Sequence, residues 1–222
     1  YGADALKFTL SYMCAQGQDV LVDKDSFKMG SRFCNKVWNA SRYILGNLEG
    51  RTLIPVADSD LNELDKWIYT CLDNAVKNAR AAFESYRYND GASAIYEYFW
   101  NDFCDWYVEA TKLSFKNGDD REKDRAVSVL LNVLEESLRL LHPYIPFVTE
   151  EIYSKLPLSQ IVENRKKAGK QKILPSEEYT GLLVTAPYPE EKASRMNKEI
   201  TERFETLKEL IRTLRGLRVE CG

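Results

Sequence analysis

Apolar residues recur every three or four positions through most of this chain, and short breaker segments interrupt the pattern. In an α-helix this spacing puts the apolar side chains on one face, where they can pack against a core. Alternation typical of a β-strand occurs only briefly, at residues 19–23, which we expect to be extended. The pattern predicts helices over residues 1–16, 26–48, 59–86, 94–115, 124–142, 146–156 and 190–220.

Short connections between these helices predict an all-α fold, an up-and-down helical bundle with a small C-terminal extension. Asn89-Asp90-Gly91 indicates the turn between the third and fourth helices. Asp25 or Ser26 could cap the helix over residues 26–48. We expect three parts along the chain: a connector helix (1–18), the bundle (19–156) and the extension (157–222).

The extension changes character after residue 157, where the helical period is lost. We expect a surface loop to residue 179, an extended segment at 182–189, and a C-terminal helix that packs on the bundle. Residues 163–172 of this loop are basic. They could contact phosphates or form an ordinary solvated loop, and the pattern leaves both interpretations open.

The composition excludes several classes of protein. With 222 residues, 44% of them hydrophobic, the chain can bury a substantial core. A net charge of −3 gives no overall basic field, so any RNA binding must depend on local basic stripes. No apolar run approaches the roughly 20 residues of a membrane span. Five scattered cysteines favour buried thiols in a reducing compartment, which indicates a cytoplasmic protein.

The titratable residues do not form a recognisable catalytic site. The single histidine, His142, precedes Pro143 at an expected helix end, where a structural role fits better than that of a base. The sequence contains neither a glycine-rich phosphate loop nor a cluster with metal-ligand spacing. Glu135-Glu136 and Glu150-Glu151 lie near Lys or Arg in predicted helices, so we expect them on solvated faces. We therefore expect no catalysis, and no cofactor or metal, in this chain alone.

The helix expected over residues 26–48 has one face that could bind RNA. At 100° per residue, Arg32, Lys36, Asn39 and Tyr43 share a narrow arc opposite a mostly apolar face. A single-stranded RNA surface needs cations for phosphates, an amide for base edges and a ring for stacking. An ordinary amphipathic helix would show the same pattern, so helix geometry alone leaves both interpretations open.

Six stretches, in the same order along the chain, resemble the class Ia aminoacyl-tRNA synthetases. The run NKVWNASR, within residues 32–43, is most similar to the valyl members, whereas HPY at 142–144 is shared with isoleucyl and leucyl members. Lys7 stands where an arginine is usual. The six stretches are YGADALKFTL (1–10), QGQDV (16–20), RFCNKVWNASRY (32–43), NDFCDWYVE (101–109), HPYIPFVTEE (142–151) and APYP (186–189).

This resemblance implies the helical domain that binds the tRNA anticodon, connected through residues 1–18 to upstream catalytic and editing domains. The whole enzyme would attach valine to valine tRNA with ATP and magnesium, as a cytoplasmic monomer without a membrane partner. This chain would recognise the anticodon stem-loop. Two alternatives stay open: the anticodon domain of an isoleucyl or leucyl enzyme, and a helical protein-interaction domain.

The resemblance also implies particular site residues. Position by position, it assigns anticodon contacts to Lys36, Arg42 and Tyr43, with a base stacked on the aromatic ring. It places Val108 and Glu109 on the other side of the pocket. Arg32 and Asn39 are added from helix geometry alone, without support from the resemblance.

Overall fold

The computed structural model describes residues 1–15, 17, 19–169 and 181–220, and this part of the chain is all-α, as the periodicity predicts. Three short 3₁₀ turns connect longer elements: η1 (Asp58–Asp60), η3 (Leu183–Thr185) and η4 (Ala193–Arg195). The helices are α1 (Ala3–Met13), α2 (Phe27–Gly46), α3 (Glu63–Glu84), α4 (Tyr88–Glu97), the π-helical segment η2 (Tyr98–Val108), α5 (Glu109–Asn117), α6 (Asp120–Leu141), α7 (Pro146–Tyr153), α8 (Leu158–Lys167) and α9 (Lys198–Glu220).

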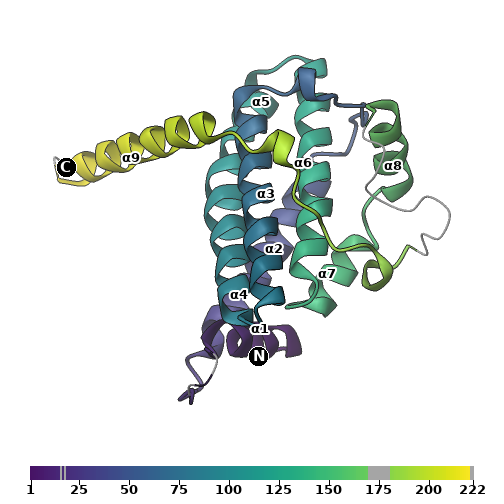
Figure 1. Ribbon diagram of the computed structural model, residues 1–222. Helices are drawn as coiled ribbons and strands as arrows, with labels where there is room; N and C mark the ends of the chain where they lie inside the picture. Colours follow the sequence, from purple (N-terminus) through teal and green to yellow (C-terminus); the bar gives the residue numbers. More distant parts are fainter. Residues whose placement is uncertain (16, 18, 170–180, 221–222) are drawn as a thin grey trace.

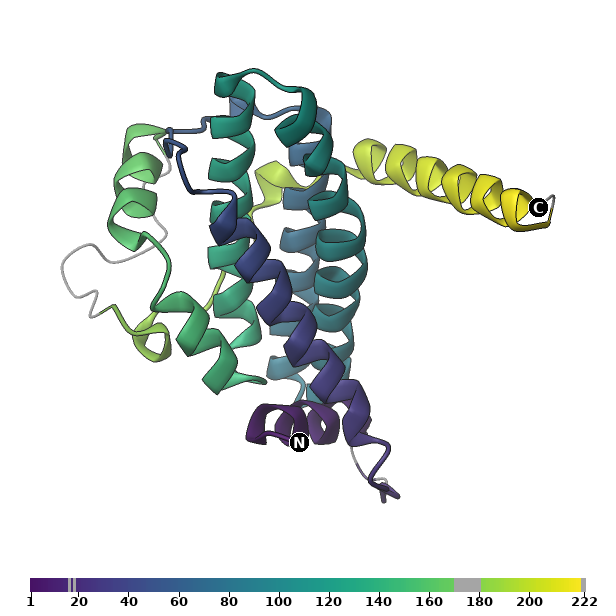
Figure 2. The same cartoon turned by 180° about the vertical axis from the view of Figure 1, so that it is seen from behind.

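Four long columns form an up-and-down bundle (Figures 1 and 2). They are α2, α3, the continuous column α4–η2–α5, and α6, and each runs opposite to the one before it. α1 crosses one end of the bundle, whereas α9 projects away from it near the other end (Figure 2). Among the described residues, no helix is both long enough and apolar enough to cross a membrane.

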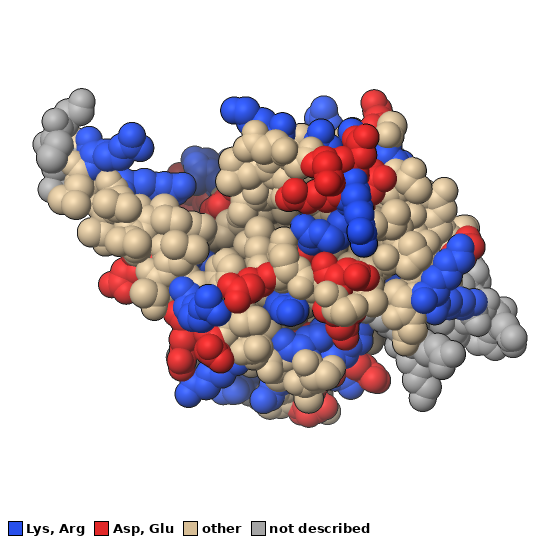
Figure 3. Space-filling model, turned by 90° about the horizontal axis from the view of Figure 1, so that it is seen from above, with Lys and Arg blue, Asp and Glu red and all other residues tan. Residues whose placement is uncertain are grey.

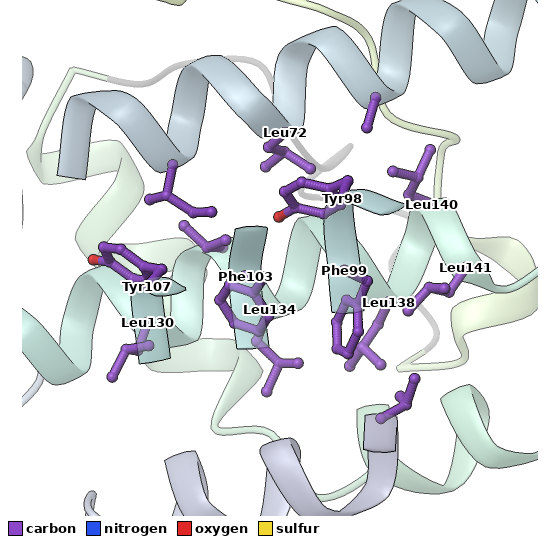
Figure 4. Close-up of a cluster of buried hydrophobic side chains, with 14 of the residues drawn as sticks. Leu72, Tyr98, Phe99, Phe103, Tyr107, Leu130, Leu134, Leu138, Leu140 and Leu141 are labelled. Atoms are coloured by element: carbon purple, nitrogen blue, oxygen red, sulfur yellow. The ribbon is translucent and has the colours of Figure 1, made fainter. Parts of the chain in front are cut away.

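The core forms where the column α4–η2–α5, packed against α2 and α3, directs its aromatic rings toward α6. Phe99, Phe103 and Tyr107 of this column, spaced four residues apart, are fully buried. That spacing suits a π-helical segment, in which hydrogen bonds reach one residue further than in an α-helix. Burying each ring contributes about 1.5–3 kcal/mol to stability. Figure 4 shows these rings among leucines of the flanking helices: Leu72 of α3, and Leu130, Leu134 and Leu138 of α6.

α1 and α2 cross at close range because residue 30 is glycine. A Cβ on Gly30 would lie 2.3 Å from the carbonyl oxygen of Ala5, so no other residue fits without displacing α1. Phe33 is fully buried, and its ring centroid lies 4.4 Å from that of Phe8 in α1. The core face of α2 therefore includes Phe33.

Two local predictions are wrong. Asn89-Asp90-Gly91 is not a turn but the first turn of α4, and the chain reverses at Tyr86, whose φ is 58°. Gly91 is needed instead for packing, since a Cβ there would lie 2.5 Å from the Tyr144 hydroxyl. Ser26, one of the two residues expected to cap α2, lies at the N-cap position, but its side chain accepts no hydrogen bond from a backbone amide of the helix.

The expected loop over residues 157–179 is also wrong in its first part, because residues 158–167 form α8. Arg165, taken as part of a basic surface stretch, is 5% exposed and binds the side chain and backbone of Asn132 in α6. Lys166 and Lys167 are exposed. The rest of that stretch, residues 170–172, lies outside the described part of the chain.

Glu135 and Glu136 are buried within a network of cations, so the prediction that they face solvent is wrong. Arg139 Nε lies 2.9 Å from Glu135 Oε1, and Arg165 Nη1 lies 2.7 Å from its other oxygen. Arg195 Nη1 lies 3.4 Å from Glu136 Oε2. Removal from water would raise the pKa of Glu136, but the surrounding cations outweigh it and hold that pKa well below its ordinary value. This network joins α6 to α8 and η4.

The segment before α9 is held by the carboxylate of Glu150, which accepts from the amides of Leu183 at 2.8 Å and Val184 at 3.1 Å. Glu150 is therefore an anchor for η3 and not simply a solvated residue. α9 begins at Lys198, later than the periodicity indicates. It packs on the bundle through its first half, where Ile200 is buried. The division of the chain into three parts stays a prediction.

Candidate RNA-binding surface

α2 presents the polar face that its periodicity predicts. Val37 and Ile44 are fully buried on the opposite face, which turns the polar side chains toward solvent. Gly30 and Phe33 fix the same orientation at the start of the helix. Of the candidate residues on α2, Arg32, Asn39 and Arg42 are exposed, whereas Lys36 and Tyr43 are partly buried.

Lys36 is directed toward the column that packs beside α2. Its Nζ lies 2.6 Å from Oδ1 of Asp105 and 5.2 Å from the centroid of the Trp100 ring, both in η2. The two charged side chains are 31% and 45% exposed, so this ion pair is worth little and can open. To neutralise a phosphate, Lys36 must leave Asp105.

Tyr43 lies about 10 Å further along α2, seven residues at 1.5 Å each. Lys112 of α5 places its Nζ 5.5 Å from the centroid of the Tyr43 ring, and the same Nζ donates to Oε1 of Glu109 at 2.6 Å. Burial raises the pKa of the Tyr43 hydroxyl, so the phenol is neutral near pH 7. A neutral ring with a cation beside it suits a stacked base and its phosphate.

Val108 and Glu109, implied for the other side of the pocket, differ in accessibility. Val108 is 5% exposed and belongs to the core, so its side chain offers almost no surface to a ligand. Glu109 is exposed and lies close enough to the Tyr43 hydroxyl to affect its pKa. The structure thus brings Glu109 near Tyr43, with the Lys112 ammonium close to both, and buries Val108 in the core.

Three residues of this surface were not predicted from the sequence: Trp100, Asp105 and Lys112. Asp105 lies 69 positions from its partner Lys36 and becomes a neighbour only when the column packs against α2. It falls within the stretch NDFCDWYVE, which was the available signal. Lys112 lies outside every matched stretch, so nothing in the sequence pointed to it.

The described residues hold no cluster with the composition of a metal site. No group of three or more His, Cys, Asp or Glu in this part of the chain could hold a metal ion. His142 ends α6 with its Nδ1 2.9 Å from the Thr149 hydroxyl, and burial lowers its pKa, as expected for a structural residue. Of the described cysteines, Cys104 is buried as predicted, but Cys14 is exposed.

A family model for the anticodon-binding domain of tRNA ligases matches residues 65–222, more than half of the chain. The chain belongs to this family. The matched range begins at α3, so α2 joins the anticodon-binding domain through its packing and through the longer alignments below.

Valine–tRNA ligases of several bacteria are similar to this anticodon-binding domain over almost its whole length. The enzyme of Treponema denticola is 58% identical and that of Treponema pallidum 56% identical, each over 100% of this chain. The enzyme of Thermotoga maritima is 38% identical over the same range. The chain spans 24%, 22% and 23% of these three relatives, about a quarter of their length.

Solved structures of two other synthetases share the fold of this anticodon-binding domain. LeuRS of Agrobacterium radiobacter, in a ternary complex with tRNA and LeuAMS, matches with a TM-score of 0.57 and 18% identity over 89% of this chain and 20% of its own. Methionyl-tRNA synthetase of Mycobacterium tuberculosis, in its apo form, matches with a TM-score of 0.57 and 17% identity over 72% of this chain and 34% of its own. At such low identity these matches show the fold alone.

Proposed function

We propose that this chain is the anticodon-binding domain of a valine–tRNA ligase and that it binds the anticodon stem-loop of valine tRNA. The observation that carries the proposal is the 58% identity to a valine–tRNA ligase over the whole chain. The family match supports anticodon binding as the role of the domain. The polar face of α2, with Lys112 and Glu109 beside it, provides the groups that an RNA loop needs.

On this surface, an unstacked anticodon base lies against the ring of Tyr43, which contributes about 1–3 kcal/mol. The exposed guanidiniums of Arg32 and Arg42 neutralise phosphates, and the amide of Asn39 bonds a base edge. Each neutralised phosphate of a single strand adds about 0.7 to the slope of log affinity against log salt. A few such contacts give weak, salt-dependent binding, which suits a domain that acts within a larger protein.

The longer protein would activate valine with ATP and magnesium and attach it to the tRNA. Those steps would take place in its own upstream catalytic and editing domains. We place this enzyme in the cytoplasm and expect it to act as a monomer.

Membership of the family disfavours the general protein-interaction domain considered from the sequence. An isoleucyl or leucyl identity is disfavoured by the relatives, since the most similar ones named above are all valine–tRNA ligases. The LeuRS match rests on fold alone and does not restore the leucyl alternative.

Titration with RNA hairpins tests the proposal. The hairpins are the anticodon stem-loops of a valine, an isoleucine and a leucine tRNA, with identical stems and with only the loops changed. The valine hairpin is expected to bind most tightly, and its binding is expected to weaken as salt rises. Equal binding of the three hairpins would contradict the specific claim.

A further inference from the structure

The arginines that lack an acidic partner occupy particular places in the fold. Most arginines of the described residues lie within 4.0 Å of a carboxylate, including Arg51, Arg125 and Arg203. Those with no such partner among the described side chains are Arg32 and Arg42 of α2, Arg121 at the start of α6, and Arg212, Arg215 and Arg218 of α9.

The three arginines of α9 form a row along its projecting half. They are exposed and follow one another at three-residue intervals, covering about 9 Å of helix. Residues 210–219 contain no acidic residue, although the chain as a whole has a net charge of −3. Figure 3 shows Lys and Arg side chains along one edge of this projecting helix. The row is therefore a local basic stripe on an otherwise acidic protein.

The first half of α9 packs on the bundle, and these contacts fix the direction in which the half that carries the arginine row projects. Phe204 stacks on Trp67 of α3, with ring centroids 4.9 Å apart and an angle of 12° between the planes. Lys208 is 4% exposed, and its Nζ lies 2.6 Å from Oδ1 of Asp102 in η2. These contacts hold α9 against both α3 and η2 at the point where it leaves the bundle.

Beyond these contacts, the row begins beside the same π-helical segment that faces α2. The guanidinium carbons of Arg212 and Arg215 lie 5.9 Å and 5.8 Å from the centroid of the Trp106 ring in η2. The residue before Trp106 is Asp105, whose carboxylate pairs with Lys36 of α2. The arginine row and the polar face of α2 are thus linked through η2.

We propose that Arg212, Arg215 and Arg218 form a second RNA-binding face, which contacts the phosphate backbone of the stem whose loop lies on α2. This inference rests on the proposed function. The row carries guanidiniums, and residues 210–219 contain no acidic group, which suits contacts with phosphates. The deep, narrow major groove of an RNA duplex keeps its base edges out of reach of such side chains. In this arrangement Tyr43 and Asn39 contact the bases of the loop, and the arginine row contacts the stem of the hairpin.

The test compares two triple variants that remove the same charge. One replaces Arg212, Arg215 and Arg218 with glutamine, and the matched control replaces the exposed lysines Lys116, Lys166 and Lys167 with glutamine. Each is titrated with the valine anticodon hairpin at several salt concentrations. The arginine variant is expected to reduce the magnitude of the slope of log affinity against log salt by about 2.7, since each of the three lost contacts with a duplex phosphate removes about 0.9. The lysine variant is expected to leave the slope nearly unchanged.

Two further arms show that the effect comes from charge and from the stem. A triple Arg→Lys variant is expected to keep the slope of the wild-type chain, because lysine also neutralises a phosphate. Shortening the stem of the hairpin is expected to remove the difference between wild type and the glutamine variant. Circular dichroism of each variant checks that helix content is unchanged.

The outcomes separate this inference from the proposed function. If wild type binds the hairpin and Tyr43→Ala weakens it, but the arginine variant keeps the wild-type slope, the second face is wrong and the α2 surface stands. An equal loss of slope in the lysine control would also overturn it, because the effect would then be one of net charge. If wild type shows no binding of any anticodon hairpin, the proposed function itself fails.

Discussion

Lys36 of α2 donates a hydrogen bond to Oδ1 of Asp105 in η2 at 2.6 Å. In the absence of RNA, the carboxylate of Asp105 therefore neutralises the charge of one cation of the candidate surface. The pair is partly exposed, and opening it costs little. An acidic residue inside a nucleic-acid surface lowers nonspecific attraction to phosphates, and it does so most where salt is low.

Replacing Asp105 with asparagine should strengthen RNA binding. The amide keeps the size of the side chain but releases the charge of Lys36, and the gain should be at most about fivefold in affinity, the energy of an exposed ion pair. Fluorescence titration with the valine hairpin measures it. Glu190→Gln, an exposed neutralisation far along the chain, is the control and should change affinity much less. Weaker binding by Asp105→Asn would show that the aspartate is a contact.

Lys112→Ala should weaken binding and lower its salt dependence. The lysine stands beside the Tyr43 ring, where a stacked base would bring its phosphate. Loss of one phosphate contact lowers the slope of log affinity against log salt by about 0.7. Lys116→Ala, one turn later on α5 and also exposed, is the matched control. A slope that is equal in Lys112→Ala and wild type would exclude Lys112 from the RNA surface.

Gly30→Ala should destabilise the fold, because a Cβ at this position would lie 2.3 Å from the Ala5 carbonyl oxygen. Overpacking of this kind costs about 1–3 kcal/mol. Gly46→Ala is the control, since nothing lies within 4 Å of a Cβ there and alanine favours the helix by about 0.5–1 kcal/mol. Urea unfolding should show a lower free energy of unfolding than wild type for Gly30→Ala and a higher one for Gly46→Ala. An unchanged midpoint for Gly30→Ala would mean that α1 can move away freely.

The sequence is sufficient to predict most of the long helices and the polar face of α2, because both follow from local periodicity, but it misses α8. The errors have a common physical origin in contacts between distant segments. Asn89-Asp90-Gly91 has the composition of a turn. Gly91 is needed, however, because the hydroxyl of Tyr144, a residue between α6 and α7, lies where a Cβ would be. The sequence around Glu135 and Glu136 is typical of a surface helix. Their burial depends on ion pairs with Arg165 and Arg195, which belong to later segments of the chain.

The candidate site was predictable only in part, for the same reason. Tyr43 and Lys36 lie on one helix, so a helical wheel finds them together. Lys112 reaches Tyr43 from another helix, and no spacing along the sequence relates the two. The resemblance to the synthetases supplied Glu109 but could not show that its neighbour Val108 is buried.

Asp73 should make stability depend on pH. Its carboxylate is 1% exposed, and burial raises its pKa to about 6. The folded state then holds the proton more tightly than the unfolded state, whose pKa is 3.8. The resulting stability is fully present below about pH 3.8 and is lost as pH rises through 6.

Asp73→Asn removes this dependence while keeping an acceptor for the Lys192 amide. Its free energy of unfolding relative to wild type should therefore rise by about 1–3 kcal/mol between pH 4 and pH 7. Urea unfolding at the two pH values measures the change, and Asp25→Asn, at an exposed position, is the control. A difference between Asp73→Asn and wild type that is the same at both pH values would contradict the raised pKa.

The central claim is that an anticodon base stacks on Tyr43, and titration of the valine hairpin with three variants tests it most directly. Tyr43→Ala should weaken binding by about 5- to 150-fold, the value of one stacked base. Tyr43→Phe, which keeps the ring, should bind nearly as tightly as wild type, and Lys166→Ala on α8 should have a small effect. Equal affinity of Tyr43→Ala and Lys166→Ala for the valine hairpin would contradict the account.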